Sequence, residues 1–174
     1  GGNLTTVGAS SLLPDVPEAI ALDGETVAVG VPGNGAPAAV WLFDARSPVR
    51  PVPRAIVSLS GSQATVIGAL AVGDGLAWAL TDVGISLIDL KPAVPSENGW
   101  LDGDEVVRGR LAAPDALAWQ GGLALLEGRR TAIVARPWGL ALVDGSDPMG
   151  PRIRSSPGGA LDRPPAAAGA AGRR

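Results

Sequence analysis

Two stretches of this chain align with one another without a gap, and this internal repeat limits the fold more than any other feature. The segments Ala69–Gly75 and Ala124–Arg130 head the two stretches, and further along Asp89 aligns with Asp144. A looser third copy begins at Ala19. Self-similarity at a period of roughly 40–55 residues is typical of folds built from stacked repeat units.

Each copy contains three short apolar runs in the same order, separated by turns rich in Gly, Pro and Asp. Runs this short, bounded by such turns, predict β-strands, because helices need about ten residues or more. The whole chain favours many turns, since it contains 25 Gly and 16 Pro among 174 residues. The predicted strands are Ala19–Leu22, Thr26–Val31 and Ala38–Phe43 in the first copy, Ala69–Val72, Leu76–Leu80 and Ile85–Ile88 in the second, and Ala124–Leu126, Thr131–Ala135 and Leu140–Val143 in the third.

A fourth, outer strand is expected at Arg54–Leu59 and again at Glu105–Leu111. Four antiparallel strands per unit is the blade arrangement of β-propellers. The strands are apolar nearly throughout, which indicates that neighbouring blades cover both faces of each sheet. We therefore expect an all-β fold of about three four-stranded antiparallel blades, a partial propeller. A competing start for the third blade is Ala116–Gly122, which also resembles a first strand and turn.

Two families of propeller repeat resemble parts of this chain. Gly139–Pro151 is similar to the LVIVD repeat of bacterial surface proteins, and Gly84–Asp89 matches that repeat without its Ser-Asp-Pro. Ile20–Gly33 looks more like an FG-GAP repeat, the blade of integrin-type propellers, and Val40–Asp44 matches the end of such a blade. The resemblance covers about residues 16–152 and implies a piece of a larger bacterial surface-type protein.

The approximate blades are then 16–60, 66–111 and 112–154, within a repeat region of 16–152. Residues 1–15 are expected to form a partial strand or linker. Residues 155–174 are rich in Ala, Gly, Pro and Arg. Such a composition buries too little apolar surface to offset the entropy of ordering, so we expect a disordered tail.

Several kinds of chemistry are excluded or disfavoured. The chain has no His and no Cys, which removes Ser-His-Asp and Cys-His catalysis and the usual zinc sites. Its net charge of −3 and scattered basic residues predict no nucleic-acid partner, and no apolar run is long enough to span a membrane. Asp102–Glu105 begins a calcium-loop spacing, but Val106 occupies the next ligand position. We expect neither a metal nor a cofactor.

The third strand of each copy ends in an aspartate, and these aspartates are expected at one rim of the propeller. They are Asp44, Asp89 and Asp144. Paired carboxylates are the machinery of glycan hydrolysis. Asp in such a place, however, more often accepts a hydrogen bond from the backbone two residues ahead, and we favour this turn-capping role. Trp41 and Trp78 lie inside apolar strands and are expected in the core.

The candidate ligand contacts are Trp100, Trp138 and Arg136, which the pattern places on loops. The favoured function is a non-catalytic propeller module that binds a protein or glycan partner in an extracellular, cell-surface or periplasmic setting. Further blades of a parent protein, or a second copy, are also expected as partners. The alternatives are a fragment of a carboxylate-based glycan hydrolase or lyase, and a cytoplasmic interaction scaffold.

Overall fold

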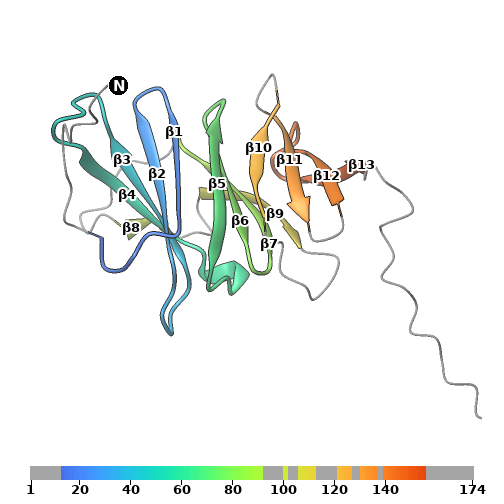
Figure 1. The fold of residues 1–174 in the computed structure, drawn as a ribbon, viewed down its shortest axis with the longest axis horizontal. Helices are drawn as coiled ribbons and strands as arrows, with labels where there is room; N and C mark the ends of the chain where they lie inside the picture. The colour runs from blue at the N-terminus through green and yellow to red at the C-terminus, as the bar shows by residue number, and fades with distance from the viewer. Residues whose placement is uncertain are drawn as a thin grey trace, which may run out of the picture.

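Short strands and tight turns build three β-sheets that stand side by side along the molecule (Figure 1). The computed structural model describes residues 13–91, 100–101, 106–112, 121–126, 130–136 and 139–155. Within each four-stranded unit the strands follow the chain order, with neighbours antiparallel, as in a meander. The fold is therefore all-β, with three successive four-stranded antiparallel units compatible with propeller blades.

The first sheet consists of β1 (Ala19–Asp23), β2 (Thr26–Val31), β3 (Ala39–Asp44) and β4 (Val52–Ser58). A short fifth strand, β8 (Trp100–Leu101), lies parallel to β4 at the outer edge. It comes from the connection that follows the third strand of the second sheet. The first sheet thus includes two residues from a later part of the chain.

The second and third sheets repeat the antiparallel unit. A single 3-10 turn, Ser60–Ser62, precedes the second sheet. The strands of the second sheet are β5 (Ile67–Gly73), β6 (Leu76–Thr81), β7 (Gly84–Asp89) and β9 (Val107–Ala112). The strands of the third sheet are β10 (Leu123–Leu125), β11 (Thr131–Arg136), β12 (Gly139–Asp144) and β13 (Arg152–Ser155).

The predicted strands are confirmed, each within two residues at either end. The sequence analysis did not predict β8 or β13. The third sheet opens with β10, as the ungapped repeat alignment requires. Most of the competing segment Ala116–Gly122 lies outside the described residues, as do 1–12, Asp102–Glu105 and 156–174.

The core contains two apolar layers, one at each junction between sheets, and a third cluster of Val29, Val31 and Phe43 on the other face of the first sheet. Between the first and second sheets, Val40, Leu42 and Val57 pack with Leu70 and Ile88. Between the second and third sheets, a second set of buried side chains surrounds Trp78, which is 0% exposed. This confirms that Trp78 belongs to the core, whereas Trp41 is only half-buried. The second sheet is covered on both faces, which explains why its strands are almost continuously apolar.

Several of the tight turns contain residues with positive φ. In the hairpin between β5 and β6, Asp74 and Gly75 have φ of 52° and 73°, as a type I′ turn requires. Gly24 takes φ of 55° between β1 and β2, and Gly139 takes 139° between β11 and β12. Residues with a Cβ rarely adopt either of these two conformations.

Candidate functional site

The three side chains predicted to contact a ligand all lie outside the described part of the structure, so their grouping stays a prediction. Trp138 lies outside the described residues. Trp100 lies in β8, paired with Ile56 of β4, rather than on the predicted loop. Arg136 is the last residue of β11. The side chains of Trp100 and Arg136 are outside the described part of the chain.

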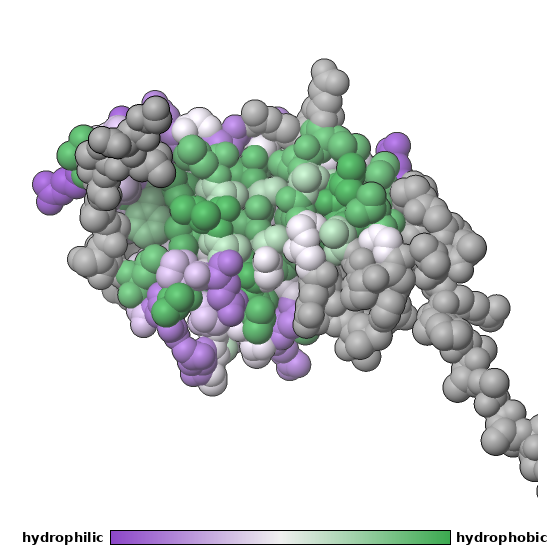
Figure 2. All heavy atoms as spheres, viewed as in Figure 1, coloured by the Kyte–Doolittle hydropathy of each residue, from purple (hydrophilic) through white to green (hydrophobic). Residues whose placement is uncertain are grey.

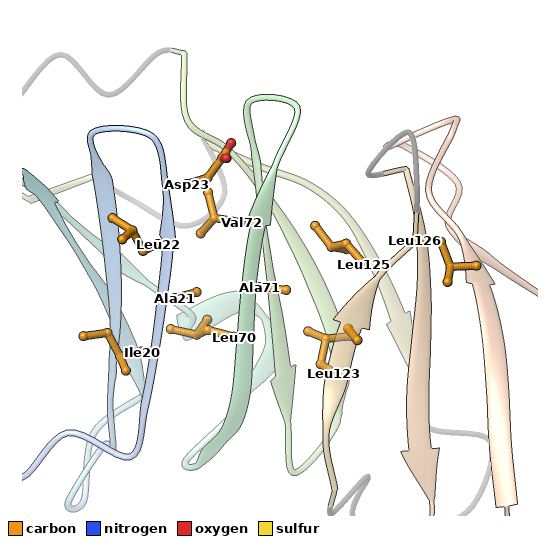
Figure 3. A pocket seen from close by; sticks show the side chains of 11 residues that line it. Ile20, Ala21, Leu22, Asp23, Leu70, Ala71, Val72, Leu123, Leu125 and Leu126 are labelled. Carbon is orange, nitrogen blue, oxygen red and sulfur yellow. The ribbon is translucent and has the colours of Figure 1, made fainter. Parts of the chain in front are cut away.

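A different feature is built by the first strand of every sheet. The strands β1, β5 and β10 are each an edge strand, with a hydrogen-bonded neighbour on one side only. They lie next to one another and border an open hollow of about 570 Å³, here called the inner groove (Figure 3). Its lining residues are Ile20, Ala21, Leu22 and Asp23 from β1, Leu70, Ala71 and Val72 from β5, and Leu123, Ala124, Leu125 and Leu126 from β10 and its end.

The side chains of the inner groove are nearly all aliphatic, and Asp23 is the one ionisable group among them. Leu70 points from β5 toward β1, whereas Leu123 and Leu125 point from β10 toward β5 (Figure 3). An edge strand leaves a row of backbone N–H and C=O groups without a partner strand. The groove therefore combines aliphatic walls with backbone hydrogen-bonding groups.

The surface around the inner groove is also apolar. Figure 2 shows a hydrophobic band that runs across the three sheets on this side of the molecule. Two of its members on β1 are strongly exposed, Ile20 at 71% and Leu22 at 65%. Contiguous apolar surface of this kind marks an interaction site more often than isolated exposed residues do.

The three rim aspartates cap turns, as the sequence analysis favoured. The backbone N–H of Arg46, Lys91 and Ser146 donates to Oδ1 of Asp44, Asp89 and Asp144, in each case at 2.9 Å. The second carboxylate oxygen also accepts from an arginine in every case. Arg46 Nε lies 2.9 Å from Asp44, Arg108 Nε 3.0 Å from Asp89, and Arg154 Nε 2.7 Å from Asp144.

Asp144 shows most clearly what this arrangement does to the carboxylates. It is only 3% exposed, and the hydrogen bonds from Ser146 and Arg154 hold the pKa of its carboxyl well below the ordinary value of 3.8. The hydrogen bonds from Arg46 lower the pKa of Asp44 in the same way. A general acid needs a carboxyl that stays protonated near neutral pH. The lowered pKa keeps the carboxyls of Asp44 and Asp144 ionised near neutral pH, which does not suit either of them to act as a general acid.

A second hollow, of about 340 Å³, lies between the hairpin turns of the second sheet and the third sheet. Its charged side chains are largely paired with one another. Arg130 forms an ion pair with Asp74 across the junction, and Arg108 forms one with Asp89. The first of these pairs joins neighbouring sheets, whereas the second lies within the second sheet. Among the described residues, no group of three or more acidic side chains is placed to hold a metal ion, and no helix is long and apolar enough to cross a bilayer.

The inner groove could not be predicted from the sequence, because the residues that line it are ordinary aliphatic strand residues. The one sequence feature that relates to the groove is the short apolar strand at the start of each repeat. The fold defines an all-β protein with three blade-like antiparallel sheets. No model of a known protein family matches the chain, and no curated protein matches it in sequence.

Proposed function

We propose that this chain is a non-catalytic propeller-type module, built from LVIVD-like and FG-GAP-like repeats, that binds an extended segment of a partner protein in the inner groove. In this proposal the module belongs to a secreted or cell-surface protein, and its sheets are blades of a closed propeller. The observation that carries the binding role is the juxtaposition of three edge strands, β1, β5 and β10, along one apolar groove.

An extended polypeptide matches both parts of this groove. Its own N–H and C=O groups pair with the open edge of a strand, while alternate side chains enter aliphatic pockets. In the centre of the groove, β5 offers Ala71 on one side and Leu70 on the other, with β1 and β10 as flanking walls. A segment with small or branched apolar residues at alternate positions suits these walls.

The lining is less suited to a glycan or to glycan chemistry. Sugar recognition relies on polar side chains and aromatic faces, and none of the described residues that line the groove is aromatic. Hydrolysis needs two available carboxylates, but Asp23 is the one acidic side chain among the described lining residues. These points favour a polypeptide ligand over the glycan expected as an alternative from the sequence.

A selection experiment tests the proposal. A displayed library of random peptides is panned against the purified chain, and a selected peptide is added while amide hydrogen exchange is followed. We expect slower exchange for amides of β1, β5 and β10, because strand addition gives edge N–H groups a partner. Val49→Asp, an exposed apolar position in the turn after β3, is the matched control and should bind equally well.

Three results would contradict the proposal: failure to select any peptide, protection confined to other strands or turns, or binding of glycans on an array in place of peptides.

A further inference from the structure

The strand registers show that every junction between sheets uses the same two kinds of face. Residues opposite one another in an antiparallel pair lie on the same face of the sheet. In the second sheet, Leu70 and Ala79 are paired and contact the first sheet, whereas Ala71 and Trp78 are paired and contact the third. Each sheet therefore has a leading face toward the preceding unit and a trailing face toward the next.

The inner strands interlock in the same way at both junctions. At the first junction, the branched residues Leu70 and Val72 of β5 pack with the small residues Ala19 and Ala21 of β1. At the second, Leu123 and Leu125 of β10 belong to the same apolar cluster as Ala69 and Ala71 of β5. Branched residues on a leading face thus meet small residues on a trailing face.

The leading face of the first sheet has the same pattern but meets no preceding sheet within the described chain. Superposing the hairpin pair Asp23–Thr26 on Gly73–Leu76 makes Ile20 and Leu22 equivalent to Leu70 and Val72. Leu13 packs on the part of this face formed by β2 and β3. The exposed part is therefore on β1, where Ile20 and Leu22 project at 71% and 65% exposure.

The trailing face of the third sheet is the counterpart. Superposing the hairpin pair Arg136–Gly139 on Thr81–Gly84 makes Ile133 equivalent to Trp78, and Leu140 equivalent to Ile85. Trp78 and Ile85 are 0% and 1% exposed because the third sheet covers them, whereas Leu140 is 45% exposed. On β10 the small residue Ala124 pairs with Ile133 and is also exposed. No described strand packs against this face.

We propose that these two faces bind one another between copies of this chain, so that the first sheet of one copy packs on the third sheet of another. Ile20 and Leu22 then pack against Ala124 and Ile133, as Leu70 and Val72 pack against the small residues of β1. A second copy is the occupant because, along β1, this contact continues the strand-edge part of a junction that the chain already makes twice. The β2–β3 part of the leading face is already covered, with Val29, Val31 and Phe43 at 6%, 2% and 3% exposure, so the contact with the second copy is confined to β1. The contact does not require a peptide in the inner groove, although Ile20, Leu22 and Ala124 also line that groove.

This contact is heterologous, since a leading face meets a trailing face and never its own kind. A heterologous contact either closes into a ring or extends into a filament. Every copy must contribute both faces for the assembly to continue, and this requirement makes the proposal sharply testable.

The test measures mass by sedimentation velocity over a concentration series, with circular dichroism to confirm that each variant keeps its β-structure. Ile20→Asp blocks the leading face, and Leu140→Asp blocks the trailing face. Because both positions are exposed, neither substitution buries a charge in the core. Val49→Asp, at 67% exposure, is the control for adding one aspartate to an exposed apolar position.

We expect the wild-type chain and Val49→Asp to associate as concentration rises, and each blocked variant alone to remain a monomer. An equimolar mixture of Ile20→Asp and Leu140→Asp should form a one-to-one pair, because the intact trailing face of the first meets the intact leading face of the second. A monomeric wild-type chain would overturn the proposal. Three other results would also overturn the proposal. They are association of either blocked variant by itself, a mixture of the two that stays monomeric, and a Val49→Asp chain that stays monomeric like the blocked variants.

Discussion

Adding a single methyl group at Gly145 tests directly whether the second and third sheets pack face to face. Gly145 follows β12, and its backbone lies against the indole ring of Trp78. A Cβ added there would lie 2.5 Å from Trp78 Cη2, 2.7 Å from Cζ2 and 2.9 Å from Leu87 Cδ2. All three distances are shorter than those seen for real Cβ contacts, so Trp78, Leu87 or the backbone at position 145 must shift.

The size of the effect follows from that crowding. Gly145 has no positive φ, so alanine adds no backbone strain and the penalty is steric. Trp78 and Leu87 are both fully buried and have no free space into which to shift. Inserting a methyl group into a well-packed core costs about 1–3 kcal/mol. For a chain of this size, each kcal/mol lowers the melting temperature by about 2–4 °C.

The assay is urea or thermal unfolding of Gly145→Ala beside a matched control, Gly122→Ala. Gly122 also lies in the third-sheet region, has no positive φ, and would have no atom within 4 Å of an added Cβ. The control should therefore keep the wild-type stability or gain slightly, because alanine restricts the unfolded chain. Equal stability of the two variants would refute the packing of Gly145 on Trp78 and the junction described here.

A double variant separates crowding from other effects. Phenylalanine lacks the Cη2 and Cζ2 positions, so Trp78→Phe removes the atoms that the new methyl group would meet. The same change also removes a buried indole N–H that has no hydrogen-bond partner among the described residues. We expect Gly145→Ala to cost less in the Trp78→Phe background, with a coupling free energy of about 0.5 kcal/mol or more.

Two further predictions concern a turn and a carboxylate. Gly139→Val should lower the free energy of unfolding by about 1 kcal/mol or more, because valine adopts a φ of 139° only with strain; an unchanged melting temperature would show that the turn tolerates a side chain. The lowered pKa of Asp144 means that its stabilising effect is present above the unfolded value of 3.8 and is lost as the pH falls further. The free energy of unfolding, measured at several acidic pH values, should therefore fall less steeply with decreasing pH for Asp144→Asn than for the wild-type chain. Identical pH dependence of the two chains would contradict this role for the carboxylate.

The strands were predictable because local chemistry determines them. Runs such as Thr26–Val31 are apolar and end at glycine, proline or aspartate, so no competing helix is available. β13 was missed because Arg152–Ser155 contains one apolar residue and is held by pairing with β12. β8 was missed because two residues carry no periodicity, and only the tertiary fold brings them beside β4.

The inner groove could not be predicted from the sequence for a similar reason. Whether a strand lies at an edge or in the middle of a sheet depends on the path of the whole chain, and Leu70 in an edge strand looks like Leu80 in a central one. The turn-capping role of Asp89 and Asp144, by contrast, was predictable, since it needs only the next two residues. The arginines that complete these caps come from strands further along the chain.

The pairing of a strand-end aspartate with an outer-strand arginine shows where such a unit tolerates added length. In the third sheet Asp144 and Arg154 are separated by 10 positions, whereas in the second sheet Asp89 and Arg108 are separated by 19. The second unit therefore holds nine extra residues between the aspartate and the arginine while keeping the same ion pair. The connection between these strands is the place to insert a foreign loop, a tag or a protease site, and the aspartate and arginine on either side are the residues to preserve.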